Sequence, residues 1–127
     1  MSKNTKTVVF VNDTHCGSNV GLMSDIAEHE DGRNVGMTYQ QGKMLDHWKM
    51  CAKKWRNPDC MILLGDLIDG AARADRGTSI WTPNLDTQAQ DFKKLYSLWG
   101  KAKKTYAIIG TPYHVVDATI KVEEGIA

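Results

Sequence analysis

The chain has 127 residues, a net charge of +1 and a hydrophobic fraction of 42%. This length corresponds to one domain, since domains commonly contain about 100–150 residues. A charged fraction of 24%, with regularly spaced apolar residues, argues against disorder. The near-zero net charge excludes a strongly basic protein that wraps nucleic acid. We therefore expect a single folded domain over residues 1–127.

No apolar stretch approaches the roughly 18 residues that a transmembrane helix requires. The longest apolar runs are Val8–Val11 and Met61–Leu64, and the first is too short for a secretory signal. The cysteines are odd in number and widely spaced, without a CxxC pair, which is typical of reduced thiols; they are Cys16, Cys51 and Cys60. These features predict a cytoplasmic protein with no membrane partner.

Strand and helix patterns alternate along the chain. Thr7–Asn12 is a short β-branched and aromatic run, which predicts a buried strand. A helix is expected from Thr38 to about Arg56, because apolar residues recur on one face of it. Thr38 with Gln41 has the spacing of a capping box at its start. Cys60–Leu64 then predicts the second strand.

The rest of the chain repeats this pattern. A second helix is expected from Thr87 to about Lys104, with a candidate capping box formed by Thr87 and Gln90. Thr105–Ile109 predicts a third strand, and Asp117–Glu124 a short final helix. The order β–α–β–α–β is typical of α/β proteins with a parallel sheet and right-handed crossovers.

A cluster of polar residues follows each predicted strand. The three clusters are Asn12–His15, Gly65–Asp69 and Gly110–His114. In a parallel sheet these clusters lie at the same edge, where open α/β folds bind their ligands. Carboxylates and imidazoles that gather there repel one another or stay unsatisfied unless a cation joins them. The pattern therefore predicts a divalent metal site.

Three residues are the candidate metal ligands. Asp13 and His15 are two positions apart, so in an extended stretch their side chains point to the same side. Asp66 follows Gly65 directly after the second strand, and the glycine lets the backbone turn closely around a site. The two oxygens of Asp66 can bridge two ions about 3.5–4 Å apart, which would hold a phosphate and activate a water.

These residues resemble the first three motifs of the calcineurin-like metallophosphoesterases, in the family's order and over essentially the whole chain. The motifs are Asp13-Thr14-His15, Gly65-Asp66-Leu67-Ile68-Asp69, and Gly110-Thr111-Pro112-Tyr113-His114. The third is similar to bacterial and phage-type members that carry GTPYH there. The resemblance implies that Asp13 and His15 bind one metal ion and that Asp66 bridges both ions. It also implies that Asp69 orients the catalytic histidine.

Two features depart from the family's pattern. The usual third motif is Gly-Asn-His, in which the Asn binds the second metal and the His protonates the leaving group. Here Thr111 takes the Asn position, and a hydroxyl is a poorer metal ligand than an amide oxygen. His114 comes two residues later than expected, so it is a candidate either for proton donation or for binding the second metal.

The second departure concerns the ligands that the family draws from a C-terminal half. No histidine follows His114, whereas the family completes both metal sites with histidines from that half. The chain therefore resembles the N-terminal half of such an enzyme. The two remaining histidines, His29 and His47, match no motif of the family.

The activity implied by the resemblance is metal-dependent hydrolysis of a phosphomonoester or phosphodiester through a metal-activated water. Its substrate would be a phosphorylated small molecule or a nucleic acid. One or two divalent ions are expected, with Mn²⁺ preferred for mixed carboxylate and imidazole ligands, and Fe or Zn as alternatives. Arg73 and Arg76 are candidate substrate ligands, because guanidinium groups match phosphate oxygens. Thr111 is a third candidate substrate residue.

Two alternative functions stay open. The first is a catalytically incomplete fragment or truncated relative that acts as a binding or assembly module. Without the C-terminal half, one face or edge of the sheet would be bare, which predicts a homo-oligomer or a second chain that supplies missing metal ligands. The second is a nuclease acting on DNA or RNA, whose nucleic-acid binding would depend steeply on salt.

Overall fold

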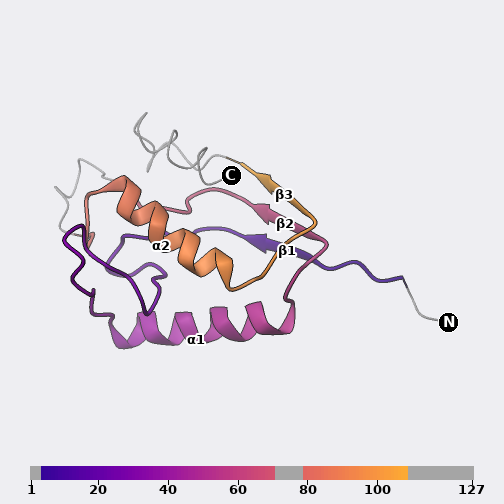
Figure 1. Ribbon diagram of the computed structural model, residues 1–127, viewed down its shortest axis with the longest axis horizontal. Helices are drawn as coiled ribbons and strands as arrows, with labels where there is room; N and C mark the ends of the chain where they lie inside the picture. Colours follow the sequence, from indigo (N-terminus) through magenta and orange to yellow (C-terminus); the bar gives the residue numbers. More distant parts are fainter. Residues whose placement is uncertain (1–3, 71–78, 109–127) are drawn as a thin grey trace.

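The computed structural model describes residues 4–70 and 79–108. Figure 1 shows its elements in the order β1 (Val8–Val11), α1 (Tyr39–Lys54), β2 (Cys60–Leu63), α2 (Leu85–Ser97) and β3 (Lys104–Ala107). The strands form one parallel sheet in the order β1-β2-β3. The predicted α/β class with a parallel β–α–β–α–β sheet is confirmed. The final helix predicted over Asp117–Glu124 lies outside the described residues.

Both helices cover the same face of the sheet (Figure 1). The burial of alternate strand residues shows this, because Val9 and Val11 of β1 are buried while Val8 and Phe10 are exposed. In β2 the inward residues Met61 and Leu63 are likewise buried. The strands lie in the sheet in the same order as in the chain. When the connections between such strands all have the same hand, successive helices lie on the same face of the sheet.

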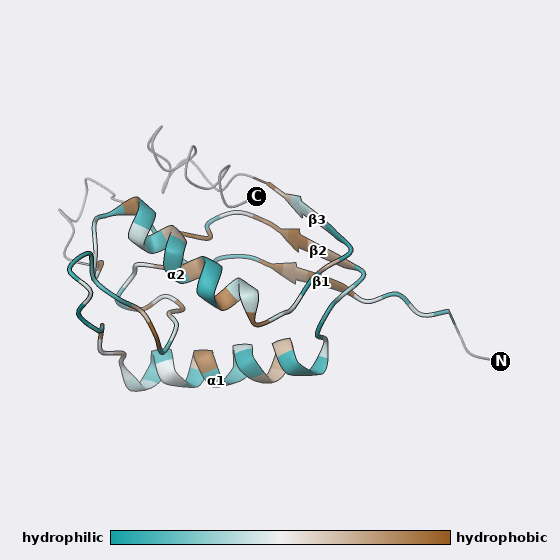
Figure 2. Ribbon diagram, in the orientation of Figure 1, coloured by the Kyte–Doolittle hydropathy of each residue, from teal (hydrophilic) through white to brown (hydrophobic). Residues whose placement is uncertain are grey.

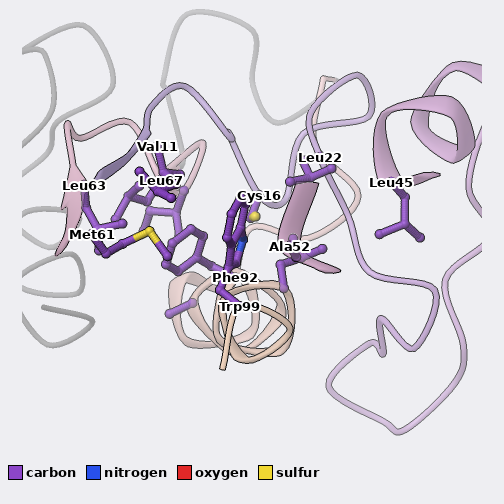
Figure 3. Packing of buried hydrophobic residues seen from close by; sticks show 14 residues of the cluster. Val11, Cys16, Leu22, Leu45, Ala52, Met61, Leu63, Leu67, Phe92 and Trp99 are labelled. Atoms are coloured by element: carbon purple, nitrogen blue, oxygen red, sulfur yellow. The ribbon is translucent and has the colours of Figure 1, made fainter. Parts of the chain in front are cut away.

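The hydrophobic core fills the space between the sheet and the helices. Phe92 and Leu95 of α2 are fully buried, and Figure 3 shows Phe92 close to Met61 of the sheet. The two helices meet through Trp48, whose ring packs edge-to-face on Trp99 at 5.4 Å between centroids. The Trp48 indole N–H also donates to the carbonyl of Leu95 at 3.0 Å. This contact ties α1 to the end of α2.

The first helix begins where the sequence predicts. Thr38 is its N-cap: its side chain accepts from the backbone N–H of Gln41, and the Gln41 side chain accepts from the Thr38 N–H. The capping box is therefore confirmed, and α1 ends at Lys54, close to the expected end. Within residues 4–70 and 79–108, no helix is both long and apolar enough to cross a membrane.

The predicted boundaries of the second helix are wrong. Asn84 caps α2 by accepting from the N–H of Thr87 at 3.0 Å, so the helix starts before Thr87 and the expected capping box of Thr87 and Gln90 is not the cap. The helix ends at Ser97, well short of Lys104. Gly100, at φ 75°, adopts the left-handed conformation in which the chain turns toward β3.

The face of the sheet opposite the helices carries exposed apolar side chains. Phe10 is 62% exposed and Tyr106 is 56% exposed, and Val8 and Ile108 are exposed as well. Figure 2 shows the hydrophobic character of β1 and β2. Among residues 4–70 and 79–108, both helices lie on one side of the sheet. The partner expected on the other side under the binding-module alternative stays a prediction.

Gln88 is a buried polar residue that ties α2 to the chain after β2. Its amide nitrogen donates to the carbonyls of Gly70 and Thr82, each at 2.9 Å, and its oxygen accepts from the Gly70 N–H at 2.9 Å. Gln88→Leu keeps the volume but leaves these backbone groups without partners. We expect it to lower the free energy of unfolding by about 2–4 kcal/mol in urea titrations.

The matched control for Gln88→Leu is Gln90→Leu, an equivalent change at an exposed position of the same helix. We expect the control to change the unfolding free energy by less than about 0.5 kcal/mol. Equal effects of the two substitutions would contradict the structural role of Gln88.

Candidate metal centre

The structure brings together the three residues that the sequence singles out as metal ligands. Asp13 and His15 follow β1, and Asp66 follows β2, so they lie beyond the carboxyl ends of adjacent parallel strands. One ligand atom of each residue lies within 4.8 Å of the other two. Asp66 is buried, whereas Asp13 is exposed. We call these three residues the ligand cluster.

The ligand cluster is built on left-handed backbone. Asp13, His15 and Asp66 have φ values of 54°, 45° and 50°, and Gly65 before Asp66 has a φ of 88°. In the described part of the chain, Asn57 is the one other non-glycine residue with positive φ. The prediction that Asp13 and His15 meet through an extended stretch is therefore wrong, because left-handed turns orient both of them. Such turns cost about 1–3 kcal/mol each and gather at functional sites.

Hydrogen bonds between the two turns stabilise this backbone. The N–H of His15 donates to the Asp66 carbonyl at 3.0 Å, and the N–H of Cys16 donates to the Leu67 carbonyl at 3.0 Å. The Thr14 hydroxyl also donates to the Leu67 carbonyl, at 2.7 Å, in a buried position. The turn after β1 and the turn after β2 are thus fixed to each other.

Asp69 orients the imidazole of His15. Its Oδ1 lies 3.1 Å from Nδ1 of His15, while Nε2 of the same ring lies 3.5 Å from Oδ1 of Asp13. The hydrogen bond to Asp69 raises the pKa of His15 above its ordinary value and outweighs burial, which lowers it. A carboxylate that holds one ring nitrogen of a histidine leaves the other nitrogen for a metal. The resemblance assigned Asp69 to a different histidine, His114, which lies outside the described residues.

The ligand cluster fits one divalent cation. Two carboxylates and one imidazole are ligands that Mn²⁺, Fe²⁺ and Zn²⁺ share. Ligand atoms about 2.0–2.2 Å from one ion lie at most about 4.4 Å apart, close to the spacing in the structure. A cation would also balance the negative charge of Asp13, Asp66 and Asp69.

The remaining predicted site residues lie outside the described residues; they are Arg73, Arg76, Thr111 and His114. Their roles in substrate binding, proton donation and a second metal site stay predictions.

Two buried glutamines support the loops around the ligand cluster, and the sequence pattern pointed to neither as a support. Gln41 donates from its side-chain nitrogen to the carbonyls of Ser18 and Gly21, at 3.2 and 3.1 Å. Gln88 holds Gly70, one residue after Asp69, through the hydrogen bonds described above. The sequence feature that could have identified them is their position: each is a glutamine near the start of its helix, on the side that faces the core.

A pocket of about 680 Å³ adjoins the ligand cluster. Its lining includes Asp13, His15 and Asp69, and also residues of α1, His47 among them. His47, which matches no family motif, therefore lies at the same pocket as the candidate ligands. The volume falls within the range of about 300–1,000 Å³ that is usual for small-molecule sites.

No protein-family model matches this chain, and no curated protein matches it either. The resemblance to the calcineurin-like metallophosphoesterases therefore stays a prediction based on the three motifs. The geometry of the ligand cluster is the independent basis for a functional proposal.

Replacing Asp69 tests whether it positions His15 for metal binding. Asp69→Asn keeps the shape of the side chain but weakens its hold on Nδ1 of His15. We expect the affinity for Mn²⁺, measured by isothermal titration calorimetry, to fall by about 10–100-fold. The control is Asp46→Asn, which removes an exposed carboxylate of α1 that does not line the pocket. Equal Mn²⁺ affinities of the Asp69→Asn and Asp46→Asn variants would contradict the role of Asp69.

Proposed function

We propose that this protein is a metal-dependent phosphoesterase of the calcineurin-like type, which hydrolyses a phosphomonoester or a phosphodiester. One observation carries the proposal: Asp13, His15 and Asp66 converge beyond neighbouring parallel strands, each on a left-handed backbone. Ligands of α/β proteins bind at this edge of the sheet. The three-stranded parallel sheet agrees with such a fold but is common to many α/β proteins.

Each residue of the ligand cluster would supply one ligand atom to a metal ion. Asp13 and Asp66 would each offer a carboxylate oxygen, and His15 would offer Nε2 because Asp69 occupies Nδ1. A divalent ion held there would supply positive charge beside a phosphoryl group and lower the pKa of a water molecule. The hydrogen bonds between the two turns hold the backbone that carries the three side chains.

Several roles in this proposal rest on the resemblance. His114 would donate a proton to the leaving oxygen or bind a second ion, and Arg73, Arg76 and Thr111 would contact the substrate phosphate. If the second site needs more histidines, a further chain or segment would supply them. A nuclease would use the same ligand cluster and belongs to the same reaction class.

The exposed apolar face of the sheet favours one second candidate function, that of an assembly module. Phe10 and Tyr106 are exposed there, and apolar side chains of this size usually pack against another surface. A module that serves only for assembly has no use for three left-handed acidic and histidine positions beside a pocket. Hydrolysis is therefore the function that the site supports best.

Asp66→Asn tests the proposal most simply. We expect Mn²⁺-dependent hydrolysis of bis(p-nitrophenyl) phosphate and p-nitrophenyl phosphate to fall by at least about a hundredfold, because the buried carboxylate at the centre of the cluster is lost. Asp46→Asn should keep the full rate. Hydrolysis that Mn²⁺ does not stimulate, or that Asp66→Asn leaves unchanged, would overturn the proposal.

A further inference from the structure

The pocket beside the ligand cluster is shared between the cluster and α1. Asp13, His15 and Asp69 line it together with Lys43, Met44, His47 and Trp48 of α1. Because the pocket adjoins the cluster, the ester group of a phosphate held at the cluster can reach it.

The side of the pocket formed by α1 is largely apolar. Met44 and Trp48 line it at positions one helical turn apart, and Lys43 and His47 repeat this spacing beside them. Val20, in the loop after β1, adds an apolar side chain that is 79% exposed. Met44 is 38% exposed, so these side chains present an accessible apolar surface at the pocket.

Trp48 makes this surface rigid. Its indole N–H is bound to the carbonyl of Leu95 at 3.0 Å, and its ring rests against Trp99 at 5.4 Å between centroids. A fixed aromatic ring binds a flat partner at low entropic cost. Met44 beside it adds a polarizable sulfur, which contacts aromatic rings favourably.

The pocket has few charged side chains in its lining. The acidic residues Asp13 and Asp69 lie at the ligand cluster, whereas Lys43 lies on α1, with its ammonium 5.3 Å from the centre of the Tyr39 ring. Among the described residues that line the pocket, Lys43 is the one lysine or arginine. The side chains of Met44, Trp48 and Val20 offer little to a strongly polar or charged ester group.

We propose, resting on the proposed function, that this pocket selects phosphate esters whose organic group is a flat aromatic ring. The phosphate lies at the ligand cluster, and the ring packs against Met44, Trp48 and Val20.

The test compares two probes that cannot be hydrolysed, phenylphosphonate and methylphosphonate, by calorimetry on the full chain with saturating Mn²⁺. They share the anionic head and differ in the ring. We expect phenylphosphonate to bind at least about tenfold more tightly, which is the gain from burying an aromatic ring. Met44→Gln and Val20→Ser should each reduce this ratio to about threefold or less. Both side chains are exposed, so neither change threatens the fold.

The matched control is Met50→Gln, an exposed methionine of α1 that does not line the pocket, and it should keep the ratio. Equal binding of the two probes, with binding that requires Mn²⁺, would overturn this inference and leave the proposed function standing. A ratio that survives both Met44→Gln and Val20→Ser would overturn it too. Binding of both probes that does not depend on Mn²⁺, or no binding at all, would overturn the proposed function together with the inference.

Discussion

The candidate site depends on the hydrogen bonds that join the turn after β1 to the turn after β2. His15 and Cys16 donate backbone N–H groups to the carbonyls of Asp66 and Leu67, and Thr14 adds a buried hydroxyl to the second carbonyl. These bonds offset the cost of three left-handed residues and hold two carboxylates and an imidazole together. Without this arrangement, like charges at the end of the sheet would move apart into solvent.

Much of the fold and the position of the cluster could be predicted from the sequence. Short apolar runs ending in polar residues located the strands, and the pairing of parallel strands then placed Asp13 and Asp66 at one edge. The start of α1 was predictable because Thr38 and Gln41 form a local capping box. Local patterns did not locate the ends of α2. Its start was missed because Asn84, like Thr87, is a residue type that caps helices. Its end was missed because the apolar pattern continues past Ser97 into a turn, where Trp99 is buried.

The details of the site could not be predicted because they depend on contacts between distant segments. The left-handed conformation of Asp13 and His15 follows from pairing with a turn some fifty residues away, which no local propensity encodes. The partner of Asp69 is equally a tertiary property, since 54 residues separate it from His15. The same holds for the pocket, which His47 and Trp48 of α1 line together with residues of the cluster. The proposed hydrolysis rests on two of these features, the ligand cluster and the pocket that adjoins it.

The most direct measurement of the central claim is the number of Mn²⁺ ions bound per chain, by metal analysis after equilibrium dialysis, for the unmodified protein and for Asp66→Asn. Our account predicts at least one ion per chain in the unmodified protein and its loss in the variant, with unchanged far-ultraviolet circular dichroism. No bound ion in the unmodified protein, or the same number in both, would contradict the assignment of Asp13, His15 and Asp66 as a metal site.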